Sequence, residues 1–95
     1  MYAVFIEVNA NESHTEAGRE VLNKHAVPGA REQGAKAAYW LAPQGDRGVS
    51  IVVFETEDEA RKAAAMFQTG EAPMPDAPEG VTVTTVEVRE VLASI

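Results

Sequence analysis

Hydrophobic residues gather in four short segments of the chain, and each of these segments predicts a β-strand. Residues 2–8 (YAVFIEV) are largely apolar at both parities, which is typical of a strand covered on both faces. Residues 36–42 and 48–55 predict two further strands, joined by a hairpin loop of sequence PQGDRG. Residues 81–91 (VTVTTVEVREV) predict the last strand, and the change of valine parity across its TT pair predicts a β-bulge.

A helical pattern of three- and four-residue spacing extends from about Ser13 to Gln33. Pro28 lies inside this pattern, and it is expected to kink the helix or to divide it in two because it lacks an amide hydrogen. Gly34 is expected to cap the C-terminal end.

Thr56 and Glu59 form a capping box that predicts a second helix over Glu57–Gln68. The apolar stripe of this helix is made of small residues and one large one: Ala60, Ala63, Ala64 and Phe67. Residues 69–80 (TGEAPMPDAPEG) contain three prolines and predict a loop without regular structure. A loop of this length is suited to be a lid over a pocket or an arm across a partner subunit.

The predicted order of elements is β-α-β-β-α-β, which is the ferredoxin-like arrangement of an α+β protein with a four-stranded antiparallel sheet. We expect residues 1–95 to form one domain. Two helices cover only one face of such a sheet, whereas the first and third strands are apolar on both faces. The uncovered face predicts a symmetric homodimer.

Composition narrows the classes of function. The net charge is −7, the isoelectric point is about 4.7, and the eight Lys and Arg residues form no basic cluster, which argues against binding to nucleic acid or to anionic membranes. The absence of cysteine excludes disulfides and thiol catalysis. The chain has neither an apolar run of about 20 residues nor a basic signal-peptide start, so a cytoplasmic location is expected.

Three segments, YAVFIEV, AAYWLAPQGDRGVSIVVFETEDEARKAAA and EGVTVTTVEVREV, cover nearly the whole chain. On these segments the chain resembles the dimeric α/β-barrel superfamily, and most of all the small bacterial proteins grouped with the antibiotic-biosynthesis monooxygenases. The resemblance implies a dimer that pairs through the open sheet face, and a ligand pocket between sheet and helices in each subunit. The superfamily has no universal catalytic motif.

Members of that superfamily include oxygenases that use neither metal nor flavin. Such enzymes bind a phenol or quinol in a dry apolar pocket, and a few polar groups stabilise the anion that reacts with dioxygen. By this resemblance we expect no cofactor, and an aromatic ligand. His25 and Asn9 are the candidate catalytic residues, and Trp40, Tyr39 and His14 are the candidate substrate-binding residues.

Tyr39 and Trp40 are adjacent on a strand, so their side chains point to opposite faces and only one can line the pocket. We expect Trp40 to face the helices and Tyr39 to face the partner subunit. Both are equally consistent with ordinary packing.

His25 lies on the apolar stripe of the first helix, where it is either a pocket histidine or a structural one bonded to a backbone carbonyl. His14 lies three turns earlier, roughly 16 Å away along the helix, so the two histidines cannot share a metal ion. The haem-degrading members use an Asn, a Trp and a haem-ligating His. Asn9 is comparably placed, but neither histidine falls on the second helix, so haem is not expected.

Glu7 is the one charged residue inside the first strand. It is either a general base or, as we expect, the partner of a cation such as Arg89. Two functions stay open: a cofactor-independent monooxygenase, and a non-catalytic dimeric binding or accessory protein. The alanine stripe of the second helix favours the latter, because small residues let the helix close on the sheet and fill the pocket.

Overall fold

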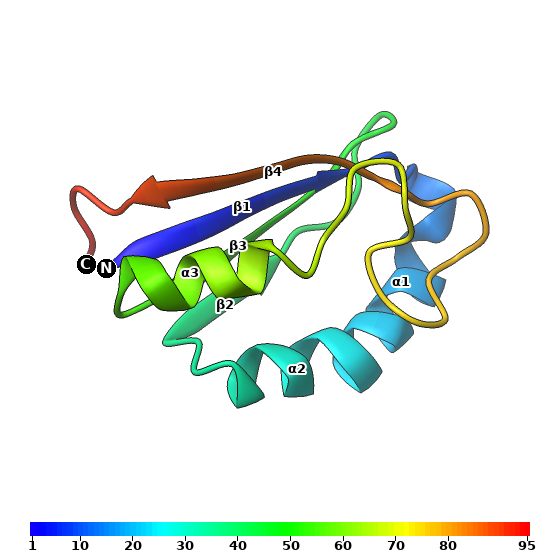
Figure 1. The fold of residues 1–95 in the computed structure, drawn as a ribbon. Coiled ribbons are helices and arrows are strands. Elements are labelled where there is room, and N and C mark those ends of the chain that lie inside the picture. The colour runs from blue at the N-terminus through cyan, green and yellow to red at the C-terminus, as the bar shows by residue number, and fades with distance from the viewer.

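The computed structural model describes residues 1–95 as a four-stranded sheet with helices on one face only (Figure 1). The strands are β1 (Tyr2–Val8), β2 (Ala37–Trp40), β3 (Gly48–Phe54) and β4 (Val83–Glu90). They lie in the order β2-β3-β1-β4, and each neighbouring pair is antiparallel. The prediction of an α+β protein with a four-stranded antiparallel sheet is confirmed, and the strand order is compatible with the ferredoxin-like arrangement.

The first helical segment is continuous but changes type along its length. It consists of η1 (Glu12–His14), α1 (Thr15–Val21), η2 (Leu22–Ala26) and α2 (Val27–Glu32). The η2 segment is a π-helix that ends just before Pro28. A wider turn accommodates the proline ring and its missing amide hydrogen, so the chain continues as α2 instead of breaking. Gly34 follows with a φ of 90°, as the helix stop requires.

The second helix, α3 (Glu57–Ala64), begins at the predicted capping box: the side chain of Thr56 accepts from the amide of Glu59. The predicted end at Gln68 is wrong by four residues. After Ala64 the helix tightens into a turn, in which the amides of Met66 and Phe67 donate to carbonyls three residues earlier, and the amide of Gly70 then donates to the carbonyl of Val83 at 2.8 Å. None of the helices combines the length and apolar character needed to cross a bilayer.

Alternation along the strands sends one set of side chains to the helices and the other to the open face. The inward set forms the core together with Ala60 and Ala63 of α3. The predicted bulge is confirmed in β4: Glu7 pairs with Thr85 but Val8 pairs with Val83, so one extra residue lies between them. The bulge keeps valines on the inward face along the whole strand.

The open face of the sheet carries no helix, as Figure 1 shows above the strands. Ile51 at 38% and Tyr39 at 66% are the exposed large apolar side chains of its strands. Glu7 forms its ion pair with Arg47 at 2.9 Å, so the expected partner, Arg89, is wrong. Arg89 lies opposite Ala3 and pairs with Glu87 instead.

Candidate functional site

A cavity of about 990 Å³ lies between the first helical segment and the sheet. Of its 36 lining residues 21 are hydrophobic, so its walls are mainly apolar. Pockets that hold small organic molecules have volumes of about 300–1,000 Å³. The cavity is therefore large enough for a ligand, and not merely a packing defect.

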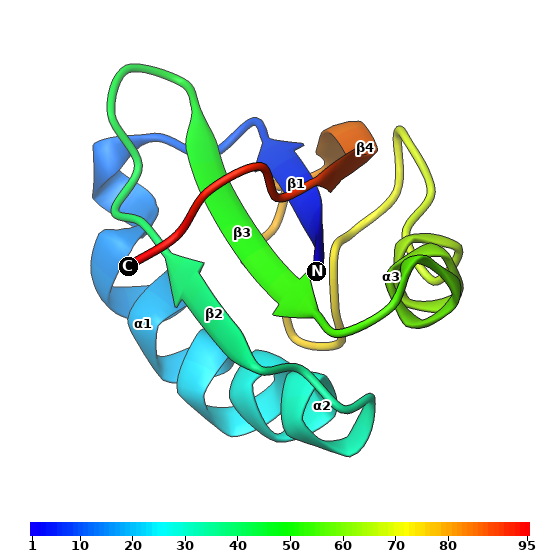
Figure 2. The same ribbon diagram turned by 90° about the vertical axis from the view of Figure 1, so that its left-hand side faces the viewer.

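The cavity exists because the two helical segments approach the sheet to different extents. On α3, Ala60 is fully buried and Ala63 is 4% exposed, so their small side chains bring this helix directly onto the strands. Along the first segment only Ala30 is buried, although that segment is much longer. Figure 2 shows that the first segment lies near the β2 edge of the sheet, whereas α3 lies toward the β4 edge of the same face. The alanine stripe fills the space under α3 alone.

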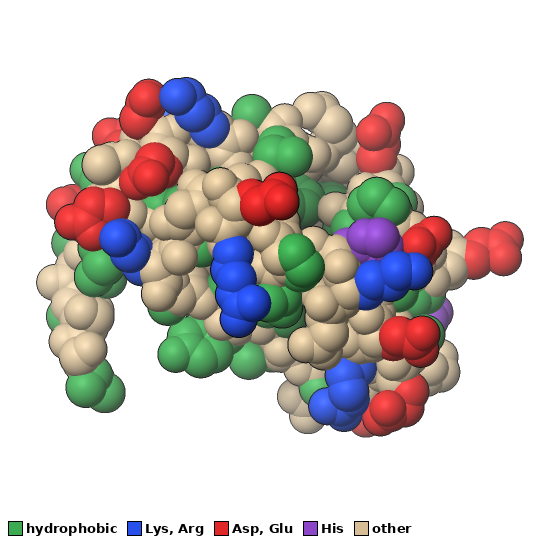
Figure 3. All heavy atoms as spheres, turned by 90° about the horizontal axis from the view of Figure 1, so that it is seen from below, with side chains coloured by type: hydrophobic (Ala, Val, Ile, Leu, Met, Phe, Trp, Pro, Cys, Tyr) green, Lys and Arg blue, Asp and Glu red, His purple; other side chains and the backbone are tan.

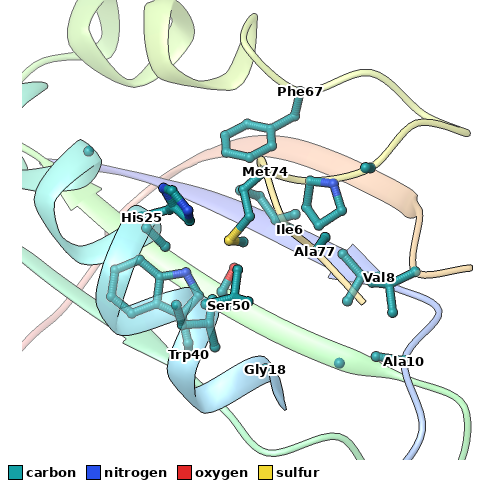
Figure 4. Close-up of a pocket in the computed structure, with 18 of the residues that line it drawn as sticks. Ile6, Val8, Ala10, Gly18, His25, Trp40, Ser50, Phe67, Met74 and Ala77 are labelled. Carbon is teal, nitrogen blue, oxygen red and sulfur yellow. The ribbon is translucent and has the colours of Figure 1, made fainter. Parts of the chain in front are cut away.

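The floor of the cavity is formed by the inward side chains of the strands. Trp40 and Ser50 line it, and they lie directly opposite each other on β2 and β3. Figure 4 shows the Ser50 hydroxyl on the cavity side, beside the indole of Trp40. Trp40 therefore faces the helices, and strand alternation sends Tyr39 to the opposite face. Tyr39 lies outside the cavity wall, on the open face.

His25 lies in η2 and lines the cavity from the helix side, with 28% of its side chain exposed. Its Nε2 lies 3.0 Å from Oδ2 of Asp76, in the proline-rich loop. Lys24 approaches the same carboxylate at 3.9 Å. Sequence reasoning missed Asp76, because nothing local indicates that a loop carboxylate will meet a helix residue 51 positions earlier.

The side chains of His14 and Asn9 form hydrogen bonds that hold the fold together. His14 lines one end of the cavity, but its Nδ1 accepts a hydrogen bond from the amide of Asn11 at 3.1 Å and so completes the cap of η1. Asn9 is exposed and is not among the lining residues. Its Oδ1 accepts from the amide and the hydroxyl of Thr82, which joins the end of β1 to the start of β4.

The proline-rich loop forms the third wall. Pro73, Met74, Pro75 and Ala77 all line the cavity. Figure 4 shows the thioether of Met74 extending from the loop into the space between His25, Ser50 and Ile6. The loop thus lies over the cavity. Ser50 was not among the residues expected at the site. Its inward position as the one polar residue of an otherwise apolar strand was the signal that could have identified Ser50 as a lining residue.

Besides the histidines, two charged side chains line the cavity, Arg19 and Glu71. Arg19 lies 3.4 Å from Glu16, which pairs with it. No group of three or more His, Asp or Glu side chains is arranged to hold a metal ion. Figure 3 shows Lys and Arg side chains scattered among acidic ones over the face that bears the first helix. The mainly apolar lining of the cavity is best matched to an apolar or aromatic ligand.

The chain matches no protein-family profile, and a comparison with the curated proteins finds no relative. The assignment of a function therefore depends on the chemistry of the cavity itself. Its distinctive features are apolar walls, an indole and a hydroxyl on the floor, and an imidazole on the opposite wall.

Proposed function

We propose that the protein binds a small, neutral, aromatic ligand in this cavity and acts on it as a cofactor-independent monooxygenase. The observation that carries the proposal is the apolar cavity of about 990 Å³ with Trp40, Ser50 and His25 on its walls. Apolar walls stabilise an aromatic ring, and a few directed polar groups select a hydroxyl-bearing one. A phenol or quinol has both features.

The roles of the side chains follow from their chemistry. His25 takes the hydroxyl proton of the bound phenol, since imidazole is the usual proton carrier near neutral pH. The indole N–H of Trp40 and the hydroxyl of Ser50 are hydrogen-bond donors for the resulting anion. The electron-rich anion reduces dioxygen: one ring carbon exchanges its single hydrogen for an oxygen atom, and the phenol is oxidised to a quinone. The second oxygen atom leaves as water, with the ring hydrogen and the hydroxyl proton that His25 took.

A second candidate is a non-catalytic dimeric binding or accessory protein. The observation that favours it is the hydrogen bond between Nε2 of His25 and Asp76, which already occupies one nitrogen of the imidazole. A histidine held in this way can form part of the wall of a binding site without taking part in catalysis. Both candidate functions require an apolar ligand that binds against Trp40.

We also propose that two copies of the protein form a homodimer, a dimeric α/β barrel. Its support is the helix-free face of the sheet, where Phe5, Ile51 and Tyr39 lie on neighbouring strands. An apolar surface of this kind is rarely left in contact with water. A second copy of the same face covers it symmetrically.

Two measurements separate the candidates. Trp40 is the only tryptophan in the chain, so quenching of its fluorescence by 1-naphthol reports binding directly. Oxygen uptake with 1,4-naphthohydroquinone, above the rate without protein, reports catalysis. His25→Ala should abolish that excess uptake, whereas His14→Ala should retain it. Binding without uptake establishes the second candidate, and the absence of both would overturn the assignment to aromatic ligands.

A further inference from the structure

The segment between α3 and β4 is fixed at both ends. At its start, the amide of Gly70 donates to the carbonyl of Val83, and the amide of Val83 donates to the carbonyl of Glu71, both at 2.8 Å. At its end, Thr82 is held by Asn9 through a backbone bond of 3.1 Å and through the Asn9 side chain. The two ends therefore stay on the sheet, whatever the residues between them do.

Between these anchors, residues 72–80 (the 72–80 loop) have a single polar side-chain attachment to the rest of the molecule. It is the carboxylate of Asp76, which contacts His25 at 3.0 Å and Lys24 at 3.9 Å. The backbone bond from Ala77 to Met74 lies within the loop. Asp76 also has a φ of 63°, the only positive value outside glycine. Such backbone strain occurs where a side chain is held in a functional position.

The 72–80 loop also places a side chain inside the cavity. Met74 extends from it toward the floor, as Figure 4 shows, and occupies space that a ligand stacked on Trp40 needs. Methionine is well suited to this position, because its flexible thioether moves and repacks at little cost. The cavity is open to solvent with the loop in place, so a movement of Met74 or of the loop widens the path to Trp40.

We propose that the 72–80 loop is a lid over the cavity and that Asp76 is its latch, bound to His25 and Lys24 in the closed state. The lid controls how fast a ligand reaches Trp40, and the proposal rests on the proposed binding function. The three prolines of the loop limit its backbone freedom, so the lid moves largely as a unit. Gly80, with a φ of 85°, is the hinge at the end of the loop, and the other hinge follows Glu71, whose carbonyl is held by the amide of Val83.

The latch is testable without any ligand, through acrylamide quenching of Trp40 fluorescence. Asp76→Asn keeps the shape of the side chain, and asparagine tolerates the positive φ, but the ionic attraction is lost. We expect the quenching constant to rise by a factor of up to about 5, because the lost attraction is that of an ion pair whose carboxylate is 65% exposed. Asp58→Asn, which loses an exposed pair with Lys62 on α3, is the matched control and should equal the wild type.

Equal quenching of Trp40 in wild type and Asp76→Asn would overturn the latch. If Asp76→Asn does not fold, Asp76→Gly replaces it in the same comparison, because glycine accepts the positive φ without strain. Stopped-flow mixing with 1-naphthol is the second arm. Asp76→Asn should accelerate association and dissociation together, and a change in dissociation alone would make Asp76 a ligand contact instead of a latch.

The two proposals fail separately. Absence of any 1-naphthol signal in the wild type counts against the proposed function and leaves the acrylamide comparison to decide the lid. Normal 1-naphthol binding with unchanged acrylamide quenching in Asp76→Asn removes the lid and leaves the binding site intact.

Discussion

Trp40 and Ser50 are direct cross-strand partners on β2 and β3, and both side chains line the cavity. The pair sets a hydroxyl and an indole N–H side by side on an otherwise apolar floor (Figure 4). A ligand whose hydroxyl oxygen lies at the edge of the indole, next to Ser50, therefore meets both donors at once. This relationship leads to the first prediction.

Ser50→Ala should weaken the binding of 1-naphthol by about 2- to 10-fold, because one hydrogen bond contributes roughly 0.5–1.5 kcal/mol. The free energy of unfolding should stay the same or rise, since the hydroxyl points into the cavity. Titration calorimetry and urea denaturation measure the two effects. Ser94→Ala, in the exposed C-terminal tail, is the control, and equal affinities for the two variants would refute a contact between Ser50 and the ligand.

Ile51→Lys should convert a homodimer into a monomer, because it places a charge at the centre of the apolar open face. Light scattering at micromolar concentration gives the mass of each form. Gln68→Lys adds the same charge on the exposed turn after α3 and should leave the dimer unchanged. A monomeric wild type would contradict the dimer itself.

Glu7→Gln should lower the free energy of unfolding by about 0.5–1 kcal/mol, through loss of the ion pair with Arg47. The effect is modest because solvent screens an arginine that is 58% exposed. Asp58→Asn, in a pair where both side chains are more than 80% exposed, should have a smaller effect. Urea denaturation compares them, and an equal loss in both variants would show that the Glu7 pair has no special weight.

Asn9→Ala should destabilise the fold by about 1–2 kcal/mol, since Thr82 loses its side-chain acceptor where β1 meets β4. Asn23→Ala removes an exposed bond to the carbonyl of Arg19 and should have a smaller effect. Thermal and urea unfolding report the difference. If Asn9→Ala is as stable as the wild type, the anchoring role of Asn9 is wrong.

Ala60→Leu should destabilise the protein by about 1–3 kcal/mol, because the alanine is fully buried where α3 meets the sheet. Ala65→Leu, at the exposed end of the same helix, should be close to neutral. Calorimetric melting distinguishes them. Similar melting temperatures for both variants would show that α3 lies farther from the strands than the structure indicates.

Local sequence patterns predicted much of the fold, because caps, bulges and strand alternation depend on interactions between residues that are close in the sequence. The valine phase shift in β4 located the bulge, and the capping box at Thr56 located the start of α3. The end of α3 was missed, because the bond from Gly70 to Val83 depends on a strand that lies later in the chain. The partner of Glu7 was missed for the same reason: a hairpin loop delivers Arg47 to the sheet face.

The sequence by itself determined the strands, the helices and the two faces of the sheet. It also determined that Trp40 and Tyr39 diverge, since a strand alternates whatever it packs against. Only the tertiary structure decided that the first helical segment leaves a cavity above Trp40, and that Asp76 of the proline-rich loop contacts His25. Both depend on distances between segments far apart in the chain, and these distances are set by the packing of the whole domain.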